Sequence, residues 1–423
     1  MRLIYTLTLS VATLGRFVSA SVLPQHGFEA EVDNTSLVDQ LYGDLLISRE
    51  GFEMQSLHSK ITPSDEDDEE FRARCGFYNE NPVQLPSDGL GSDLVIFAGI
   101  VSFAHLPIAR CFTPGAEDFD IAIVGAPYDT STSFRPGARF GPNGIRQGSR
   151  RLGSGVSPVR GFPGSKLRQL DPYNAGYKLV DCGDVPMSPF DNRVALNQLY
   201  RGQRTIHKNK SVKDPSQPPK IITLGGDHTV TLMNLRSAYE QWGRLAVIHF
   251  DSHIDSWDPR VLGGNITKST ALNHGTFLHY AHEKGYLAPN NSIHVGIRAP
   301  FLGPDDEKHD FECGFEKIVA RDIDIVGIKG IVDRIKQHVT GWPVYLTLDI
   351  DSIDMAVAPG TGTPEPGGFS AREILTILDG LEGLNIVGAD VVEVAPAYDT
   401  NGDITSTIAA SVVDSILGLM TID

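Results

Sequence analysis

The chain has 423 residues, of which 41% are hydrophobic and 21% charged, and its formal net charge is −17. This size and composition are sufficient for a large buried core in one or two domains. The negative charge argues against nucleic acid or an anionic membrane as a partner and is compatible with a cationic substrate or metal ions, although solubility alone would also explain it.

Residues 1–20 have the pattern of a secretory signal peptide. Arg2 supplies the positive charge, residues 3–15 are mostly apolar, and Val18-Ser19-Ala20 places small residues before a cleavage point. We therefore expect a protein of the secretory pathway, either secreted or delivered to a vacuole or cell wall; a disordered N-terminus is the alternative. No other apolar run is long enough to span a bilayer, so no membrane contact is expected in the mature form. Four glycosylation sequons agree with this route, at Asn34, Asn209, Asn265 and Asn290.

The four cysteines, Cys75, Cys111, Cys182 and Cys313, form no CxxC zinc pattern. Four cysteines allow three disulfide connectivities, and the sequence does not choose among them. Cys182 lies in a strand-like run, so we expect it to be a free buried thiol. Cys75 with Cys111 is the pairing to test first.

Residues 21–95 are predicted to form a separate N-terminal extension. They contain the acidic run 65–70, which is typical of a solvated or disordered segment, and a possible short amphipathic helix at 39–47. No chemistry is assigned to this extension. The remaining domain, residues 96–423, contains all the motifs described below.

From about residue 117, apolar strand-like runs alternate with helix-like segments. Such alternation predicts a parallel sheet covered by helices on both faces, with ligands bound beyond the carboxyl ends of the strands. The predicted strands are 121–124, 178–180, 221–224, 245–250, 293–297, 318–320, 344–348 and 386–394. The predicted helices are 229–242, 277–284, 328–339, 371–381 and 404–417, and a capping box opens the fourth at Ser370 and Glu373.

Three polar motifs follow predicted strands: 225–228 (Gly-Gly-Asp-His), 251–255 (Asp-Ser-His-Ile-Asp) and 349–351 (Asp-Ile-Asp). Side chains at positions i and i+2 of a strand share a face, so the acidic and imidazole groups of each motif should point together. So much negative charge in one place is costly unless cations neutralise it. Oxygen ligands with a minority of imidazole suit manganese or magnesium, and the pattern predicts a two-metal hydrolytic centre. Its candidate ligands are His228, Asp251, His253, Asp255, Asp349 and Asp351.

Other polar residues near these motifs have supporting interpretations. His249 is expected to be a core histidine or to support a ligand, and Asp227 to hold its loop by hydrogen bonds. The Gly-rich segment 359–368 lacks the lysine of a phosphate-binding P-loop and is expected to wall the site. Three arginines could form an anion site or, equally, ion pairs: Arg135, Arg139 and Arg146.

The chain from about residue 95 onward resembles the ureohydrolases, the arginase and agmatinase family, and is most similar to an agmatinase. The resemblance rests on 224–228, 247–255 and 347–354, with further agmatinase-like stretches at 97–103, 125–129 and 135–142. It implies a three-layer α/β/α fold around a central, mainly parallel eight-stranded sheet, and a homo-oligomer, a trimer or hexamer.

The resemblance also implies roles for individual residues. Two Mn²⁺ ions would be held, one by His228, Asp251, Asp255 and Asp349 and the other by Asp251, His253, Asp349 and Asp351. His274 would be a proton shuttle, and Glu393 would bind the planar guanidinium, which a carboxylate fork matches well. Without the resemblance, His274 could be a surface or core histidine and Glu393 a capping or salt-bridge residue.

The implied activity is hydrolysis of a guanidino group with release of urea, with agmatine converted to putrescine. A guanidinobutyrase or other guanidino-acid amidinohydrolase is the first alternative, with Arg260 or Lys268 meeting the substrate carboxylate. A binding protein without turnover on the same scaffold, or a deacetylase-like metal hydrolase, is less favoured. The long loop from Asp255 to His274 differs from what we expect of a bacterial agmatinase, so it leaves the substrate open.

Overall fold

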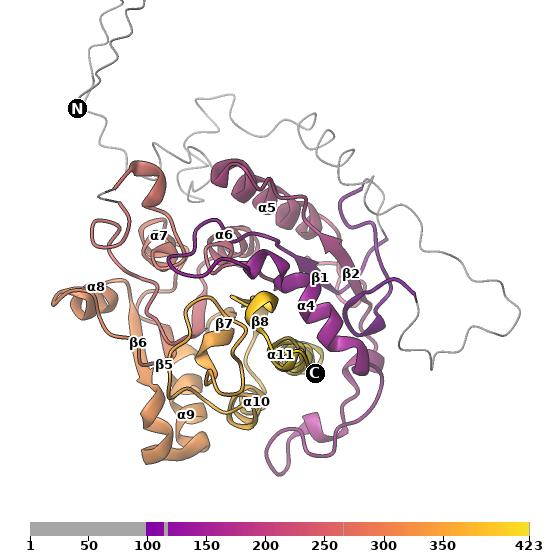
Figure 1. The fold of residues 1–423 in the computed structure, drawn as a ribbon. Helices are drawn as coiled ribbons and strands as arrows, with labels where there is room; N and C mark the ends of the chain where they lie inside the picture. The colour runs from indigo at the N-terminus through magenta and orange to yellow at the C-terminus, as the bar shows by residue number, and fades with distance from the viewer. Residues whose placement is uncertain (1–98, 114–116, 265, 423) are drawn as a thin grey trace, which may run out of the picture. The chain divides into compact units, whose positions relative to one another are not determined.

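The computed structural model describes residues 99–113, 117–264 and 266–422 (Figure 1). The predicted signal peptide, the extension 21–95, Cys75 and the sequons at Asn34 and Asn265 lie outside these residues.

A single parallel sheet organises the part of the chain that the structure describes. Its eight strands have the order β2-β1-β3-β8-β7-β4-β5-β6, and every neighbouring pair is parallel. This confirms the predicted eight-stranded α/β architecture. The strands are β1 (Ile121–Gly125), β2 (Leu179–Asp184), β3 (Lys220–Leu224), β4 (Ala246–Phe250), β5 (Ser292–Ile297), β6 (Phe315–Val319), β7 (Val344–Asp349) and β8 (Ile386–Val392).

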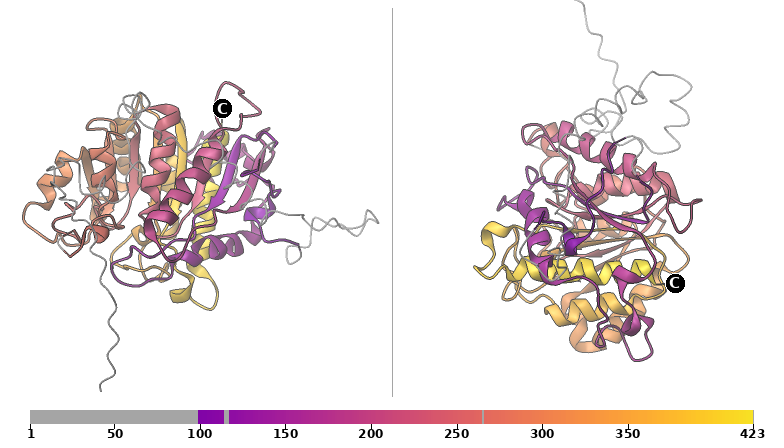
Figure 2. Two further views of the ribbon diagram at one scale, coloured as in Figure 1. Left: turned by 90° about the horizontal axis from the view of Figure 1, so that it is seen from above. Right: turned by 90° about the vertical axis from the view of Figure 1, so that its right-hand side faces the viewer.

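Helices cover both faces of the sheet and complete three layers (Figures 1 and 2). One face carries α5 (Asn192–His207), α6 (Val230–Trp242) and α7 (Phe277–Glu283). The other carries α4 (Gly141–Gly148), α9 (Ile323–Val339), α10 (Ala371–Gly380) and α11 (Ile404–Thr421), while α8 (Asp306–Glu312) packs beside β6. Short 3₁₀ helices lie at 103–105, 138–140, 149–151, 166–169, 172–174, 268–270, 320–322, 350–352 and 396–398.

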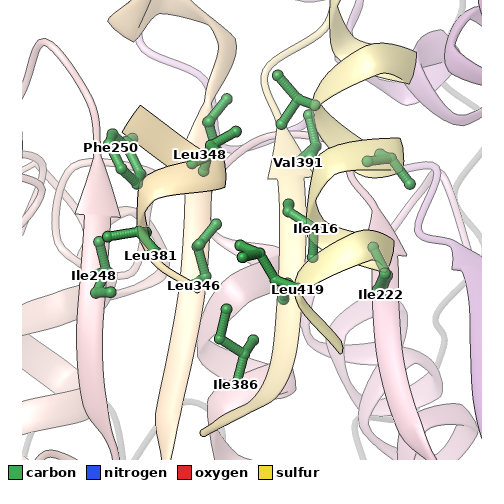
Figure 3. Close-up of a cluster of buried hydrophobic side chains, with 14 of the residues drawn as sticks. Ile222, Ile248, Phe250, Leu346, Leu348, Leu381, Ile386, Val391, Ile416 and Leu419 are labelled. Carbon is green, nitrogen blue, oxygen red and sulfur yellow. The ribbon is translucent and has the colours of Figure 1, made fainter. Parts of the chain in front are cut away.

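The strands are apolar on both sides because helices bury both faces of the sheet. In β4, Ile248 and Phe250 belong to the core beneath α9, α10 and α11, whereas Val247 belongs to the core beneath α5, α6 and α7. In β7, Leu346 alternates with Tyr345 in the same way. Figure 3 shows side chains of β3, β4, β7 and β8 meeting those of α11 and of Leu381, directly after α10, in the first of these cores.

Helix α11 is the one helix among the described residues that is long and apolar enough to cross a membrane by length and composition. In the structure 72% of its 18 residues are buried, and it packs against α4, α10 and β8. Its apolar sequence is therefore explained by its place in the core.

The predicted helices are all present, with ends shifted by a few residues. The capping box of α10 is confirmed: the Ser370 hydroxyl accepts from the Glu373 N–H at 3.2 Å, and the Glu373 carboxylate accepts from the Ser370 N–H at 2.8 Å. Three helices had not been predicted, namely α4, α5 and α8. Helix α8 has seven mostly charged residues, so it lacks the apolar periodicity that marks a longer amphipathic helix.

The predicted cysteine pairing is wrong. Cys111 forms a disulfide with Cys182, so Cys182 is not a free thiol, and the Cα atoms are 5.5 Å apart. Residues 107–111 run beside β2. The backbone N–H of Asp181 donates to the Pro107 carbonyl, and the backbone carbonyl of Asp181 accepts from the Ala109 N–H. This pairing, between segments far apart in sequence, brings the two cysteines together. Cys313 is the free, buried cysteine of the described residues.

Candidate metal centre and active site

His228 lies between β3 and α6 in a loop that allows close approach of the backbone. A Cβ atom at Gly226 would lie 1.9 Å from the Tyr128 carbonyl oxygen, so only glycine fits there. The His228 ring is fully buried, and its Nε2 lies 2.8 Å from the Thr347 hydroxyl. Because that contact fixes one side of the ring, Nδ1 faces the carboxylates described next.

Asp251, His253 and Asp255 come together through a loop and not through a regular strand. Strand β4 ends at Phe250, and Asp255 has a left-handed backbone with φ of 49°. The Asp251 carboxylate accepts from the His253 N–H at 2.6 Å, which tightens the turn. The predicted convergence is therefore present, but a loop with a left-handed residue produces it, and not strand alternation.

Asp349 and Asp351 come from the end of β7. Asp349 is the last residue of the strand, and Asp351 lies in the short 3₁₀ helix that follows. The Asp351 N–H donates to the Asp349 carboxylate at 2.7 Å, and the Asp351 carboxylate accepts from the Ser252 N–H at 3.1 Å. These bonds join the ends of β7 and β4.

The six predicted ligands form two overlapping groups. His228 Nδ1 lies 3.0 Å from Asp251, 3.1 Å from Asp255 and 3.4 Å from Asp349. His253 Nδ1 lies 3.2 Å from Asp251 and 3.1 Å from Asp351. Asp251 therefore belongs to both groups. The geometry follows from the strand order, since β3, β8, β7 and β4 are neighbours and present their carboxyl ends at one edge.

The electrostatics of these groups fit bound cations. Burial, followed by the charges of Asp351 and Asp251, raises the pKa of Asp349 well above its ordinary value. Burial and Asp251 likewise raise the pKa of Asp255 to about 6. Asp251 Oδ2 and His228 Nδ1 are buried without a well-aligned hydrogen bond, although they lie 3.0 Å apart. Buried carboxylates and imidazoles that lack a well-aligned hydrogen bond are suitable ligands for metal ions.

His249 supports the centre through a buried chain. Its Nε2 lies 3.1 Å from Asp251, and its Nδ1 lies 2.7 Å from His294 Nδ1, whose Nε2 is 2.9 Å from Asp310. Burial lowers the pKa of His249 to about 3, so its ring is neutral. This agrees with the predicted supporting role. His294 and Asp310 had not been singled out in the sequence, because they lie far from every motif along the chain.

Asp227 holds its loop as predicted, accepting from the backbone N–H groups of Ser131 and Thr229, each at 3.0 Å. Of the three arginines, two form ion pairs and not an anion site: Arg139 with Asp129, and Arg146 with Asp181 and Asp184. Arg135 lies over the rings of Phe134 and Tyr398.

His274 and Glu393 contact each other above the centre. His274 Nδ1 lies 3.1 Å from Glu393 Oε1, and its Nε2 accepts from the Ser133 N–H at 3.0 Å. Burial lowers the pKa of His274, but Glu393 more than offsets it and raises the pKa to about 9. The Ser133 N–H meets the Nε2 lone pair, so in the neutral ring the proton lies on Nδ1, which faces Glu393.

Only one of the two carboxylate oxygens of Glu393 accepts a hydrogen bond from a described residue. Its Oε1 accepts from the His228 N–H at 2.9 Å, whereas its Oε2 is buried without a hydrogen-bond partner among the described residues. The residue also has a left-handed backbone with φ of 62°. Strained backbone of this kind gathers at functional sites, and sequence alone gives no signal for it.

A cavity of about 200 Å³ opens over the centre. The Gly-rich segment contributes Thr363 and Glu365 to its wall, as predicted. The indole N–H of Trp257 donates a hydrogen bond of 2.8 Å to the Asp306 carboxylate, which holds the ring in the wall. No lysine or arginine lines this cavity among the residues that the structure places. Its lining is Ser133, His253, Asp255, Trp257, Leu262, His274, Gly275, Ala299, Pro300, Leu302, Asp349, Thr363 and Glu365.

The chain is similar to known proteins over most of its length. The model of the arginase family matches residues 119–418. "Putative agmatinase 1" of Schizosaccharomyces pombe is 44% identical over 346 residues, covering 79% of this chain and 86% of that protein. The agmatinase of Neisseria meningitidis serogroup C is 36% identical, covering 75% and 92%. The structure of proclavaminate amidinohydrolase from Streptomyces clavuligerus superimposes with a TM-score of 0.67 at 33% identity, covering 77% and 98%.

These matches, with the three-layer fold, define the class: the chain belongs to the arginase family. Within that family it is a ureohydrolase, a hydrolase acting on guanidino groups, and it is most like an agmatinase.

Proposed function

We propose that this protein hydrolyses agmatine to putrescine and urea at a centre of two Mn²⁺ ions. His228, Asp251, Asp255 and Asp349 would hold one ion, and Asp251, His253, Asp349 and Asp351 the other. The donor set of four carboxylates and two imidazoles supports this assignment because hard oxygen ligands suit Mn²⁺. The bound pair supplies Lewis acidity that lets a water ionise near neutral pH.

The free oxygen of Glu393 is the observation that carries the guanidino specificity. A buried carboxylate oxygen without a partner is costly, and a guanidinium N–H would satisfy it with a charge-assisted bond. Because the other oxygen is fixed by His228, the carboxylate has a defined direction. Glu393 would thus orient the guanidinium carbon toward the metal pair.

His274 is placed to move a proton. It contacts Glu393 through Nδ1 and keeps Nε2 toward Ser133 at the cavity wall. Imidazole can act as a general acid and base, so His274 would transfer a proton to the leaving amine. Putrescine would then depart as the leaving group, and urea would retain the guanidino carbon.

The charge of the cavity favours agmatine over a guanidino acid. Agmatine ends in a second cation, and the described cavity wall offers the Glu365 carboxylate and no lysine or arginine. Arg260, which was considered for a substrate carboxylate, is largely exposed and pairs with Asp258. Neither it nor Lys268 lines the cavity.

A guanidino-acid amidinohydrolase is the second candidate. It is supported by the relative named proclavaminate amidinohydrolase, whose structure superimposes over most of its length. Similarity alone does not separate the two because that relative and the bacterial agmatinase are about equally similar to this chain. The cavity charge is what favours agmatine.

The activity is tested by measuring urea and amine release from the Mn²⁺-loaded protein with agmatine, arginine and 4-guanidinobutyrate. We expect kcat/KM to be highest for agmatine. A preference for 4-guanidinobutyrate would support the second candidate. Tight metal binding without urea from any of the three would point to a binding protein on this scaffold.

Passage through the secretory pathway and assembly into trimers or hexamers are further proposals that rest on the sequence and the family resemblance. Fractionation with glycosidase treatment would test the first, and sedimentation of the purified protein the second.

A further inference from the structure

A second group of metal-ligating side chains lies between α7 and α8, apart from the centre at the strand ends. It consists of His279 on α7, His309 on α8, and Cys313, which follows α8 directly. Their ligand atoms all lie within 4.8 Å of one another. We call these three residues the α7–α8 cluster. The proposed reaction uses none of them.

The spacing within the α7–α8 cluster is close to that of a zinc site. His279 Nδ1 lies 3.1 Å from His309 Nε2, and Cys313 Sγ lies 3.7 Å from the same His309 nitrogen. Tetrahedral zinc, with bonds of about 2.0 Å to nitrogen and about 2.3 Å to sulfur, separates two nitrogens by about 3.3 Å and a nitrogen from a sulfur by about 3.6 Å. The two observed contacts therefore match two edges of the tetrahedron.

The helices hold the cluster in place. His309 and Cys313 are four residues apart, so they share one face, and the Cys313 N–H donates to the His309 carbonyl at 2.9 Å. On α7, His279 Nε2 lies 3.6 Å from the Glu283 carboxylate. Metal-bound histidines commonly direct their second nitrogen to a carboxylate, which orients the ring. His279 thus has its Nδ1 facing the cluster and its Nε2 beside an acid.

We propose that the α7–α8 cluster binds one Zn²⁺ ion through His279, His309 and Cys313. A thiolate with two imidazoles is a softer donor set than the Asp-rich centre, so it favours zinc over manganese. Cys313 is buried and the two imidazoles are half-buried, which leaves solvent for the fourth position. Binding replaces the thiol proton, which passes to solvent.

The site would fix two helices that border the active site. The ring of Phe277 at the start of α7 packs against His228, with ring centroids 4.5 Å apart. Asp306 at the start of α8 anchors Trp257 in the cavity wall. A metal ion that links α7 and α8 would hold both contacts in register, so its role would be structural.

Cobalt is the probe for this site because thiolate coordination gives Co²⁺ a charge-transfer band in the near ultraviolet. The Mn²⁺-loaded full chain, with its disulfide intact, is titrated with Co²⁺. We expect the band to saturate at one equivalent, to disappear in Cys313→Ser, and to require at least about tenfold more Co²⁺ in His309→Ala. The Asp-rich centre has no sulfur, so Co²⁺ bound there gives no such band.

Cys75→Ser is the matched control, because Cys75 could supply a thiolate, and it should keep the band. A band that is absent from the wild type, that survives in Cys313→Ser, or that is lost in Cys75→Ser overturns the proposal. X-ray absorption of the zinc-loaded wild type needs no variant. We expect one sulfur at about 2.3 Å from zinc, and a shell of nitrogen and oxygen alone contradicts the site.

Discussion

The predicted metal ligands and the side chains of the cavity above them are held by the fold in different ways. The ligands follow β3, β4 and β7, which lie with β8 in the middle of the sheet, and hydrogen bonds such as Asp351 to Ser252 join one strand end to the next. The cavity wall comes from separate loops, which side-chain contacts such as Trp257 to Asp306 hold in place. We therefore expect the strand ends to hold the reacting groups and the loops to select the substrate.

Removing one charge from the centre should have the largest effect. Asp251→Asn keeps the size of the side chain that both ligand groups share, but it removes the shared charge. A metal pair contributes several kcal/mol of transition-state stabilisation, so we expect kcat/KM for urea release to fall by at least about a thousandfold. Bound manganese, measured by elemental analysis, should fall with it.

Asp324→Asn is the matched control, since Asp324 is exposed on α9. It should keep both activity and metal. Full metal content together with full activity in Asp251→Asn would remove Asp251 from the centre.

His274→Asn tests the region where the centre meets the cavity. Loss of a general acid or base typically costs about a hundredfold to ten-thousandfold, and we expect that loss in kcat. The manganese content should stay at the wild-type level because His274 is not among the proposed ligands. His105→Asn, at an exposed position, controls for loss of an imidazole. An unchanged kcat with only KM altered, or a loss of metal, would contradict a proton-transfer role.

Glu365→Gln probes the cavity wall and should have a smaller effect. Losing one charge-assisted contact to the amine of agmatine should raise KM by about tenfold, with kcat changed little. KM for 4-guanidinobutyrate should stay the same or fall. The exposed residue Glu316 offers Glu316→Gln as a control. Equal increases for both substrates would show that Glu365 does not read the substrate tail.

Relative to the variant Asp255→Asn, the metal-free protein should lose stability as the pH rises from about 4 to about 6. Asp255 has a folded-state pKa of about 6, above its ordinary value of 3.8, so its stabilising proton is fully bound below about pH 4 and is lost as the pH passes 6. Asp349, whose pKa is also raised, acts in the same direction, whereas the low pKa of Asp251 matters only at more acidic pH. Chemical denaturation of the metal-free wild type and of Asp255→Asn at several pH values measures the difference.

Added Mn²⁺ should reverse this trend, because cations bind the carboxylates after the protons have left. Metal-free wild type that gains stability relative to Asp255→Asn between about pH 4 and pH 6 would contradict the crowded arrangement of carboxylates.

The sequence predicted the sheet and the convergence of the six side chains, for a physical reason. Parallel strands end at one edge, so motifs that follow β3, β4 and β7 converge even though they are distant in sequence. Each motif was visible because apolar residues precede it directly.

Three features could not be predicted from the sequence, because they depend on contacts between distant segments or on backbone strain. Cys111 pairs with Cys182 because residues 107–111 lie beside β2, and no local pattern marks that pairing. The chain from His249 through His294 to Asp310 crosses two strands and a helix. The left-handed backbone of Asp255, at φ of 49°, likewise has no sequence signature.

The proposed activity depends on a pair of metal ions at one edge of the sheet. Anomalous diffraction at the manganese absorption edge, from crystals of the active Mn²⁺-loaded protein, tests it most directly. We expect two anomalous peaks among His228, Asp251, His253, Asp255, Asp349 and Asp351, with Asp251 between them. A single peak there, or none, in protein that releases urea would contradict it.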